Sequence, residues 1–257
     1  MKFSKKLLLI FGGVVALAVL AKVFIFSSNI EDDNVPQFIQ ADFIDLDKMY
    51  SISKFRSGSG HDFSGNGEKC RSMKHYFNTQ DTREKMAIFD RNNGLSPKPD
   101  GVNDIDIYSP VDGEIIVVKN DQMSLGQQIF IRPKNYSSYT VRLFHIYLDS
   151  PIQKGSKVSA GQKIGVISQY QNTDIAIMGG LFGRKLISYF DVMPNNVFAN
   201  YIARGLQSRD DFIISKEERD LDPLKCNKER FLEQRNNNDP RDFIFLSGYI
   251  DPNEISF

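Results

Sequence analysis

Histidines next to carboxylates are the residues of this chain most suited to chemistry. The chain has three histidines. His61 is followed directly by Asp62, while His145 lies in the segment LFHIYL and precedes Asp174 in NTDIAIM. Imidazole and carboxylate groups can move protons or ligate a metal ion. No HxH or HExxH pair occurs, so spacing alone defines no metal site, and His75 in MKHYF is expected to be structural or on the surface.

Short β-strands are expected to position these side chains. The stretch from Tyr108 to Ser168 reads as strand segments separated by Gly and Pro turns, which is typical of an all-β sandwich or barrel. Within it, Val141, Leu143 and His145 alternate with their neighbours, so we expect these three side chains on one strand face. By the same rule His61 and Asp62 should point to opposite faces, unless a bulge re-aims one of them.

Three segments carry a family resemblance. SPVDGEI, FHIYL and GSKVSAGQKIGVIS resemble the M23 (LytM-like, lysostaphin-type) peptidase domain over roughly Phe55 to Ile177. The resemblance implies a mainly β, duplicated-hybrid-motif sandwich, here with an N-terminal membrane helix and small C-terminal helical additions. Members of this family are zinc endopeptidases that cut peptide crosslinks of the bacterial cell wall. Others have lost the metal and act as binding or regulatory modules.

The resemblance also assigns roles to single positions. The segment SGSGHDFS resembles the family's first metal motif, HxGxDF, in which Asp62 matches a zinc ligand and Gly58 stands in place of a histidine ligand. His145 matches an assisting histidine. Asp174 replaces the second assisting histidine, and Ala176 replaces the last zinc ligand.

One retained carboxylate does not supply the three protein ligands that a catalytic zinc needs. We therefore expect no cofactor and a non-catalytic module, a pseudoenzyme. Asp62, His61, His145 and Asp174 are expected to form the binding site, and Asp62, His145 and Asp174 should lie on one face of a cleft.

Two other interpretations remain open. In the first, His61, Asp62, His145 and Asp174 converge on zinc in a rearranged site, which would make the chain an M23-type metalloendopeptidase acting on cell-wall peptides. In the second, the hairpin pattern belongs to a lipoyl or biotinyl carrier or to a sugar-phosphotransferase IIA domain. A carrier lysine at a hairpin tip and a second facing histidine are both missing, which disfavours the second interpretation.

The N-terminus predicts a membrane segment. Basic residues precede an apolar run through residue 26, so we expect a transmembrane anchor over residues 1–26 with the rest of the chain extracytoplasmic, at the inner (cytoplasmic) membrane. A cleaved signal segment and secretion is the alternative. We expect a tether over 27–48, the β domain over 49–192 with an insertion at 64–106, and a C-terminal helical extension over 193–257.

The cysteine count predicts a disulfide, and the net charge limits the classes of partner that we expect. Cys70 and Cys226 are the two cysteines, and an even, sparse count in an exported protein predicts one disulfide; two buried free thiols are the alternative. The formal net charge is zero, which gives no reason to expect nucleic acid as a partner. We expect a cell-wall peptide, a glycan or an envelope protein instead.

Overall fold

The computed structural model describes residues 35–79, 98–102, 104–121, 125–180, 185–233 and 239–246. The expected membrane segment, residues 1–26, lies outside these ranges. The stretch DTREKMAIF, Asp81 to Phe89, whose sequence predicts a short helix begun by Asp81 or Thr82, also lies outside them. Within the described ranges, no helix is long and apolar enough to cross a membrane.

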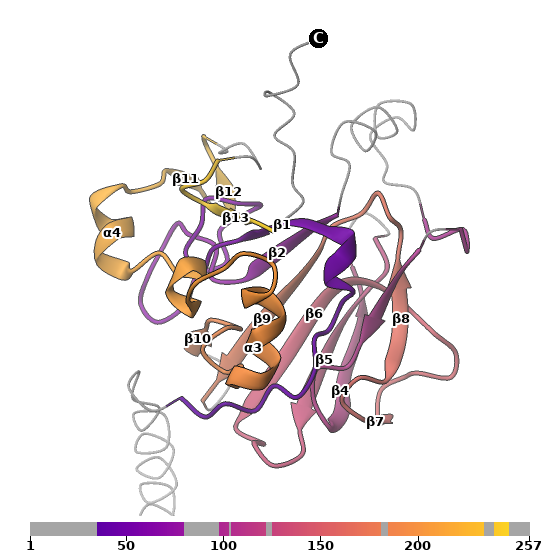
Figure 1. Cartoon of the computed structure of the whole chain (residues 1–257). Helices are drawn as coiled ribbons and strands as arrows, with labels where there is room; N and C mark the ends of the chain where they lie inside the picture. The colour runs from indigo at the N-terminus through magenta and orange to yellow at the C-terminus, as the bar shows by residue number, and fades with distance from the viewer. Residues whose placement is uncertain are drawn as a thin grey trace, which may run out of the picture.

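The domain is built on one large antiparallel sheet of eleven strands (Figure 1). Its main path runs β13–β1–β2–β9–β6–β5–β4–β7, while β10 pairs with β9, and β8 pairs with both β3 and the end of β6. The strands are β1 Met49–Ser53, β2 His75–Thr79, β3 Ile105–Tyr108, β4 Gly113–Asn120, β5 Gln127–Pro133, β6 Tyr139–Leu148, β7 Lys157–Val158, β8 Lys163–Ile167, β9 Thr173–Gly179, β10 Lys185–Ile187 and β13 Phe243–Phe245. A separate small ribbon joins β11, Cys226–Asn227, to β12, Arg230–Phe231. The prediction of a mainly β domain is confirmed.

Few helices accompany the sheet in the described part of the chain, and all of them except η2 follow β10. The helical elements are η2 Leu46–Lys48, α3 Asn195–Ile202, η5 Arg209–Phe212 and α4 Lys216–Leu221. In α4 the Ser215 side chain accepts from the Glu218 backbone N–H, and the Glu218 carboxylate accepts from the Ser215 N–H, which is a capping box. Helix α3 buries Phe198 and Tyr201 against Phe190 and Phe212, so it is a packed part of the domain.

The expected tether and the expected insertion both contribute residues to the body of the domain. Residues 35–48 fall within the expected tether, yet Phe38, Ile39, Phe43, Ile44 and Leu46 are all buried. Strand β2 falls within the expected insertion at 64–106, yet it lies between β1 and β9 near the middle of the sheet. Burial of apolar side chains, including the fully buried Phe77 of β2, favours both placements.

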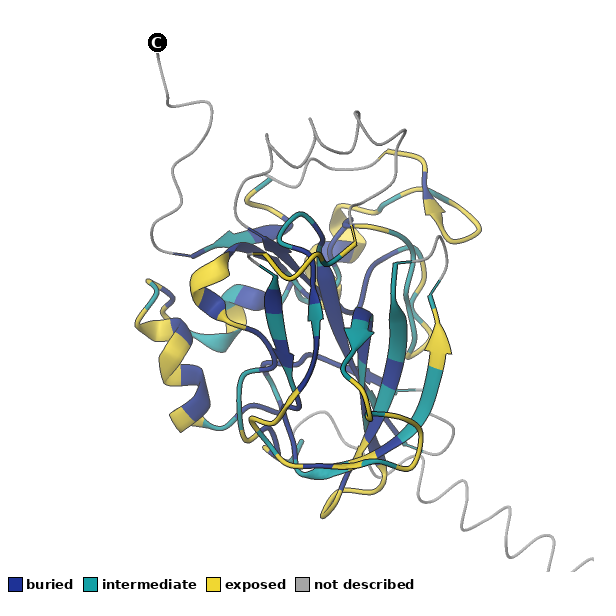
Figure 2. Cartoon of the chain, turned by 90° about the vertical axis from the view of Figure 1, so that its right-hand side faces the viewer, coloured by how far each residue is buried: buried dark blue, intermediate teal, exposed yellow. Residues whose placement is uncertain are grey.

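The two faces of the central strands differ in character. The core face carries Val141 and Leu143 of β6 with Ile175 and Ile177 of β9, all fully buried. Figure 2 shows stretches of buried residues, in dark blue, along the strands of the sheet. His75 also points into the interior, with ring nitrogens 2.8 Å from the Ser53 carbonyl oxygen and 3.0 Å from Ser188 Oγ. Burial lowers the pKa of His75 to about 4, so this imidazole is a neutral structural group.

Candidate functional site

The candidate site lies on the opposite face of strands β2, β9 and β6. Tyr76 and Phe144 each lie directly across from Asp174 on neighbouring strands, and Arg142 lies across from Ala176. Directly opposed residues of antiparallel strands share a face. Polar and aromatic side chains are therefore gathered around Asp174, which is fully buried.

His145 joins this face because of a β-bulge. Leu143 pairs with Ile129 and Ile146 pairs with Gln127, so β6 carries one more residue than β5 in this interval. His145 has a φ of 61°, in the left-handed region. The expectation that His145 shares a face with Val141 and Leu143 is wrong, because the extra residue moves its side chain off the core face and towards Asp174.

Several contacts hold this unfavourable backbone conformation in place. The Asp121 carboxylate accepts from the His145 backbone N–H at 3.3 Å and contacts His145 Nδ1 at 2.7 Å. The Gln171 side-chain amide donates to the His145 carbonyl oxygen at 2.7 Å. A strained residue that its surroundings over-determine is a hallmark of functional positions.

A buried lysine supplies the positive charge at the centre of the site. Lys74 lies immediately before β2, and its ammonium group forms an ion pair with the Asp174 carboxylate, with side-chain exposures of 1% and 0%. The ammonium also lies 4.2 Å from the ring centre of Phe144, 4.7 Å from that of Tyr76 and 5.2 Å from that of Phe63. Aromatic faces stabilise a desolvated cation, so Lys74 is held in a cage of three rings and a carboxylate.

The ion pair extends into a chain of alternating charge: Lys74, Asp174, His145, Asp121. His145 Nε2 lies 3.2 Å from Asp174 Oδ1, and Nδ1 faces Asp121. Burial disfavours the imidazolium, but the charge of Asp174 and the contacts with both carboxylates outweigh it and raise the pKa of His145 to about 9. Burial likewise opposes ionisation of Asp174, but Lys74 and His145 hold its pKa well below the usual range.

These contacts limit what His145 can do. Each ring nitrogen faces a carboxylate, and at neutral pH the ring carries both protons. A doubly protonated imidazole has no lone pair with which to accept a proton. His145 is therefore arranged as a fixed cation and not as a general base.

His61 and Asp62 point in different directions. His61 Nε2 lies 3.3 Å from the Lys74 ammonium, at the edge of the charged chain. Asp62 Oδ1 instead accepts from the Arg71 backbone N–H at 3.1 Å. Burial and the charge of Lys74 lower the pKa of His61, so its Nε2 can accept a hydrogen bond from the ammonium. The structure thus gathers His61, His145 and Asp174 around Lys74. The Asp62 carboxylate is instead directed to the Arg71 backbone, which differs from the expectation that Asp62, His145 and Asp174 share one face of a cleft.

Known structures share the arrangement of the chain in part. The solution structure of lysostaphin matches at 19% identity and a TM-score of 0.27, over 36% of this chain and 44% of that one. SpoIIQ in the SpoIIQ–SpoIIIAH pore-forming complex matches at 12% identity and a TM-score of 0.40, over 66% of this chain and 99% of the other. Csd3 of Helicobacter pylori matches at 14% identity and a TM-score of 0.39, over 62% and 35%. No family model matches the sequence, and no curated protein sequence matches it.

The chain is similar in fold to M23-like domains. It spans less than half of the lysostaphin chain. The likeness concerns the fold, and what the site can do must be judged from its own residues.

The M23-like ligand positions do not fit a zinc ion. Ala176 has no donor atom, and Gly58 has no side chain; a Cβ atom at Gly58 would face Asp242 and Leu224 at 3.1 and 3.2 Å. The Asp62 carboxylate is directed to the Arg71 backbone. In the described part of the chain, no three His, Cys, Asp or Glu side chains are grouped so as to hold a metal ion.

Sequence reasoning missed the two residues that complete the charged chain. Lys74 stands in MKHYF, within the expected insertion at 64–106, and a lysine is seldom fully buried unless it is paired. Asp121 follows directly after β4, and only the bulge at His145 brings the two together. Nothing local in the sequence signals that long-range pairing.

Proposed function

We propose that this chain is a non-catalytic M23/LytM-like module that binds a cell-envelope partner: a peptide, a glycan or a protein. We further propose that its N-terminal segment anchors it in the cytoplasmic membrane with the domain extracytoplasmic. The observation that carries the non-catalytic assignment is the Lys74–Asp174 ion pair, with its charge extended to His145.

The ion pair supports this assignment on chemical grounds. Hydrolysis by an M23-type mechanism needs a metal-bound water and a group that can accept its proton. Here the carboxylate that replaces one assisting histidine is neutralised by a lysine, and the other assisting histidine already carries both protons. A fixed ammonium beside His61 also repels a metal cation at short range.

The rim of the same site supplies surface for a partner. His61, Phe63 and Arg142 are half-buried, and the His145 side chain is 23% exposed. The rings and charges of this rim are held by packing, so a partner would meet a preorganised surface. We propose that the envelope partner contacts His61 and Phe63.

Zinc titration and a cleavage assay test the catalytic half of the proposal. The full-length chain, purified in detergent, is titrated with zinc by calorimetry and incubated with purified cell-wall peptides. We expect neither stoichiometric zinc binding nor cleavage. Tight stoichiometric binding together with cleavage would instead support the alternative, a zinc metallopeptidase with a rearranged site.

Co-sedimentation with isolated cell-wall sacculi, and crosslinking in intact cells, test the binding half. We expect the double variant His61→Ala, Phe63→Ala to lose the wall or protein contact. Leu221→Ala is the matched control, because Leu221 is 87% exposed and lies on α4. Equal binding by both variants would contradict the proposed surface.

A further inference from the structure

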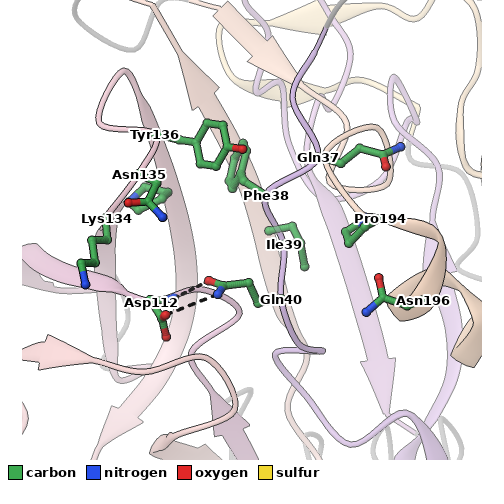
Figure 3. Close-up of a pocket in the computed structure, with 11 residues that line it drawn as sticks. Gln37, Phe38, Ile39, Gln40, Asp112, Lys134, Asn135, Tyr136, Pro194 and Asn196 are labelled. Atoms are coloured by element: carbon green, nitrogen blue, oxygen red, sulfur yellow. Dashed lines mark hydrogen bonds between the residues drawn. The ribbon is translucent and has the colours of Figure 1, made fainter.

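A polar groove with one exposed aromatic ring lies away from the charged chain. It has a volume of about 330 Å³ and is formed by residues 37–40, the β5–β6 turn and the start of α3 (Figure 3). The turn contributes Asn135 and Tyr136, and the α3 segment contributes Pro194 and Asn196. Asp112, which directly precedes β4, also lines the groove, so four parts of the chain that are far apart in sequence meet in one depression.

The groove and the charged chain lie towards opposite ends of β6. The groove adjoins the start of the strand, which begins at Tyr139, whereas His145 lies six residues further on. At about 3.3 Å per residue this separation is roughly 20 Å. Binding of a ligand in the groove therefore does not require the Lys74–Asp174 ion pair, and it is independent of the proposed function.

Tyr136 has the features of a stacking platform. Its ring stacks on Phe38, with centroids 5.3 Å apart and an interplanar angle of 29°, and Phe38 is in turn packed against Tyr139 at 5.1 Å. Phe38 is 4% exposed and Tyr136 is 37% exposed. Among the residues that the structure describes, Tyr136 is the one aromatic side chain classed as exposed. An exposed ring that is held from behind offers its free face to an apolar ligand surface at low entropic cost.

Side-chain amides line the same groove as this ring (Figure 3). Gln37, Asn135 and Asn196 are exposed lining residues, and no hydrogen bond to another described residue occupies their amide groups. An amide offers both donors and acceptors, which suits a hydroxyl-bearing ligand that also has both.

Hydrogen bonds fix Asp112 in the groove, and the groove carries one acidic and one basic side chain. The Asp112 backbone N–H donates to Gln40 Oε1 at 2.7 Å, and Asp112 Oδ1 accepts from the Ala160 N–H at 2.9 Å. Lys134 lines the groove with Asp112, so neither sign of charge dominates. A second groove of about 430 Å³ shares Asp112, Pro133 and Lys134 with the first, which gives room for an extended chain.

We propose that this groove binds a neutral oligosaccharide, with one sugar ring stacked on Tyr136. A sugar has apolar faces and hydroxyl edges, which match one aromatic platform in a groove that is also lined by amides. A strongly anionic ligand would meet the Asp112 carboxylate, and a purely apolar ligand would leave the amides unpaired.

Calorimetric titration of the full-length chain with tri-N-acetylchitotriose, and separately with cellotriose, tests the proposal. We expect at least one of these neutral sugars to bind, and Tyr136→Ala to weaken that affinity by about tenfold. Tyr136→Phe should bind like the unchanged chain. Leu221→Ala should also leave sugar affinity unchanged, because Leu221 lies on α4 and does not line the groove.

Failure of both sugars to bind at millimolar concentration would overturn the proposal, and so would binding that Tyr136→Ala does not weaken. Unchanged thermal unfolding of Tyr136→Ala shows that a loss of affinity is local. The double variant His61→Ala, Phe63→Ala tests the other site. A groove that binds no sugar would therefore not contradict the proposed function, and a result against the proposed function would not contradict sugar binding in the groove.

Discussion

The ammonium group of Lys74 lies against the carboxylate of Asp174, and solvent reaches neither side chain. The protein thus carries its own cation at the centre of the candidate site. Burying both charges costs desolvation energy, and the attraction between them offsets it only when the remaining contacts are good. The rings of Phe63, Tyr76 and Phe144 and the imidazolium of His145 provide those contacts.

Removing Lys74 should destabilise the domain more than removing any exposed lysine. In Lys74→Met the Asp174 charge stays buried and loses its main partner, which costs about 3–5 kcal/mol of unfolding free energy. Urea denaturation followed by circular dichroism measures it. Lys154→Met, in an exposed turn, is the control and should change the unfolding free energy by less than about 0.5 kcal/mol.

The double variant Lys74→Met, Asp174→Leu separates pairing from packing. Replacing both charges by apolar groups removes the unpaired carboxylate, so much of the lost stability should return. If Lys74→Met were as stable as the control Lys154→Met, the Lys74–Asp174 ion pair would contribute nothing to the stability of the fold.

The sequence predicts the elements better than it predicts the site. Turn residues and alternating apolar residues indicate the β architecture, and the Ser215–Glu218 spacing predicts the start of α4. These features are local, because turn chemistry and strand period are properties of a few neighbouring residues. The disulfide between Cys70 and Cys226 is also confirmed.

The site depends on long-range geometry, which explains the errors. A bulge inverts the side-chain pattern from its own position onward, so the expected face of His145 was wrong. Lys74 gained its role because β2 is inserted beside β9, a pairing that no short segment encodes. The separate directions of His61 and Asp62 were predictable, because adjacent residues of an extended chain point apart.

His145 should make stability fall as pH rises above neutrality. Its pKa is raised to about 9 in the folded state against about 6.5 unfolded, so the contribution is complete below pH 6.5 and is lost between pH 6.5 and 9. The shift corresponds to about 3 kcal/mol at most. Denaturant midpoints measured from pH 6 to pH 9.5 should fall, and His145→Gln should flatten that fall.

His75 provides the opposite dependence within the same protein. Its pKa is lowered to about 4, so its contribution is present above pH 6.5 and is lost as pH falls towards 4. His75→Gln should therefore leave the alkaline limb unchanged. If His145→Gln also leaves it unchanged, the imidazolium is not what stabilises the fold at neutral pH.

Gly60 should tolerate alanine far less than Gly67 does. Both have positive φ, 69° and 79°, so alanine is strained by about 1–2 kcal/mol at either position. A Cβ atom at Gly60 would lie 2.0 Å from the Tyr76 hydroxyl oxygen, whereas one at Gly67 meets nothing within 4 Å. Displacing Tyr76 disturbs the cage of Lys74, so Gly60→Ala should cost about 1–3 kcal/mol beyond Gly67→Ala in thermal or urea unfolding. Equal costs would mean that Tyr76 moves aside freely.

Reduction of the disulfide should loosen the C-terminal extension from the loop that carries His61. Cys70 and Cys226 are 156 residues apart, and nearby the Asp62 N–H donates to the Glu229 carbonyl oxygen. Opening so long a loop costs about 5 kcal/mol in the chain-entropy model. Cys70→Ser, Cys226→Ser should show that loss in urea denaturation and should be insensitive to dithiothreitol. If the protein with both cysteines present had the same unfolding free energy with and without dithiothreitol, this expectation would be contradicted.

Placing histidines at the two positions where the M23 resemblance expects zinc ligands should not create a zinc site. In Gly58→His, Ala176→His the new side chain at position 58 begins beside Asp242, which is buried in an ion pair with Arg219. The new imidazole therefore starts in a crowded, charged place and not beside Asp174, so we expect lower stability and no gain in zinc affinity by calorimetry.

Adding Lys74→Ala to that double variant tests which obstacle dominates. Without the Lys74 ammonium, a zinc cation near His61 and Asp174 is no longer repelled by a neighbouring positive charge. The Asp62 carboxylate still accepts from the Arg71 backbone N–H. Because a zinc site needs its ligands within about 2.0–2.2 Å of one point, the triple variant should still bind zinc weakly. Tight stoichiometric binding by the triple variant alone would identify Lys74 as the sole barrier, and tight binding by the double variant would show that the ligand positions still converge.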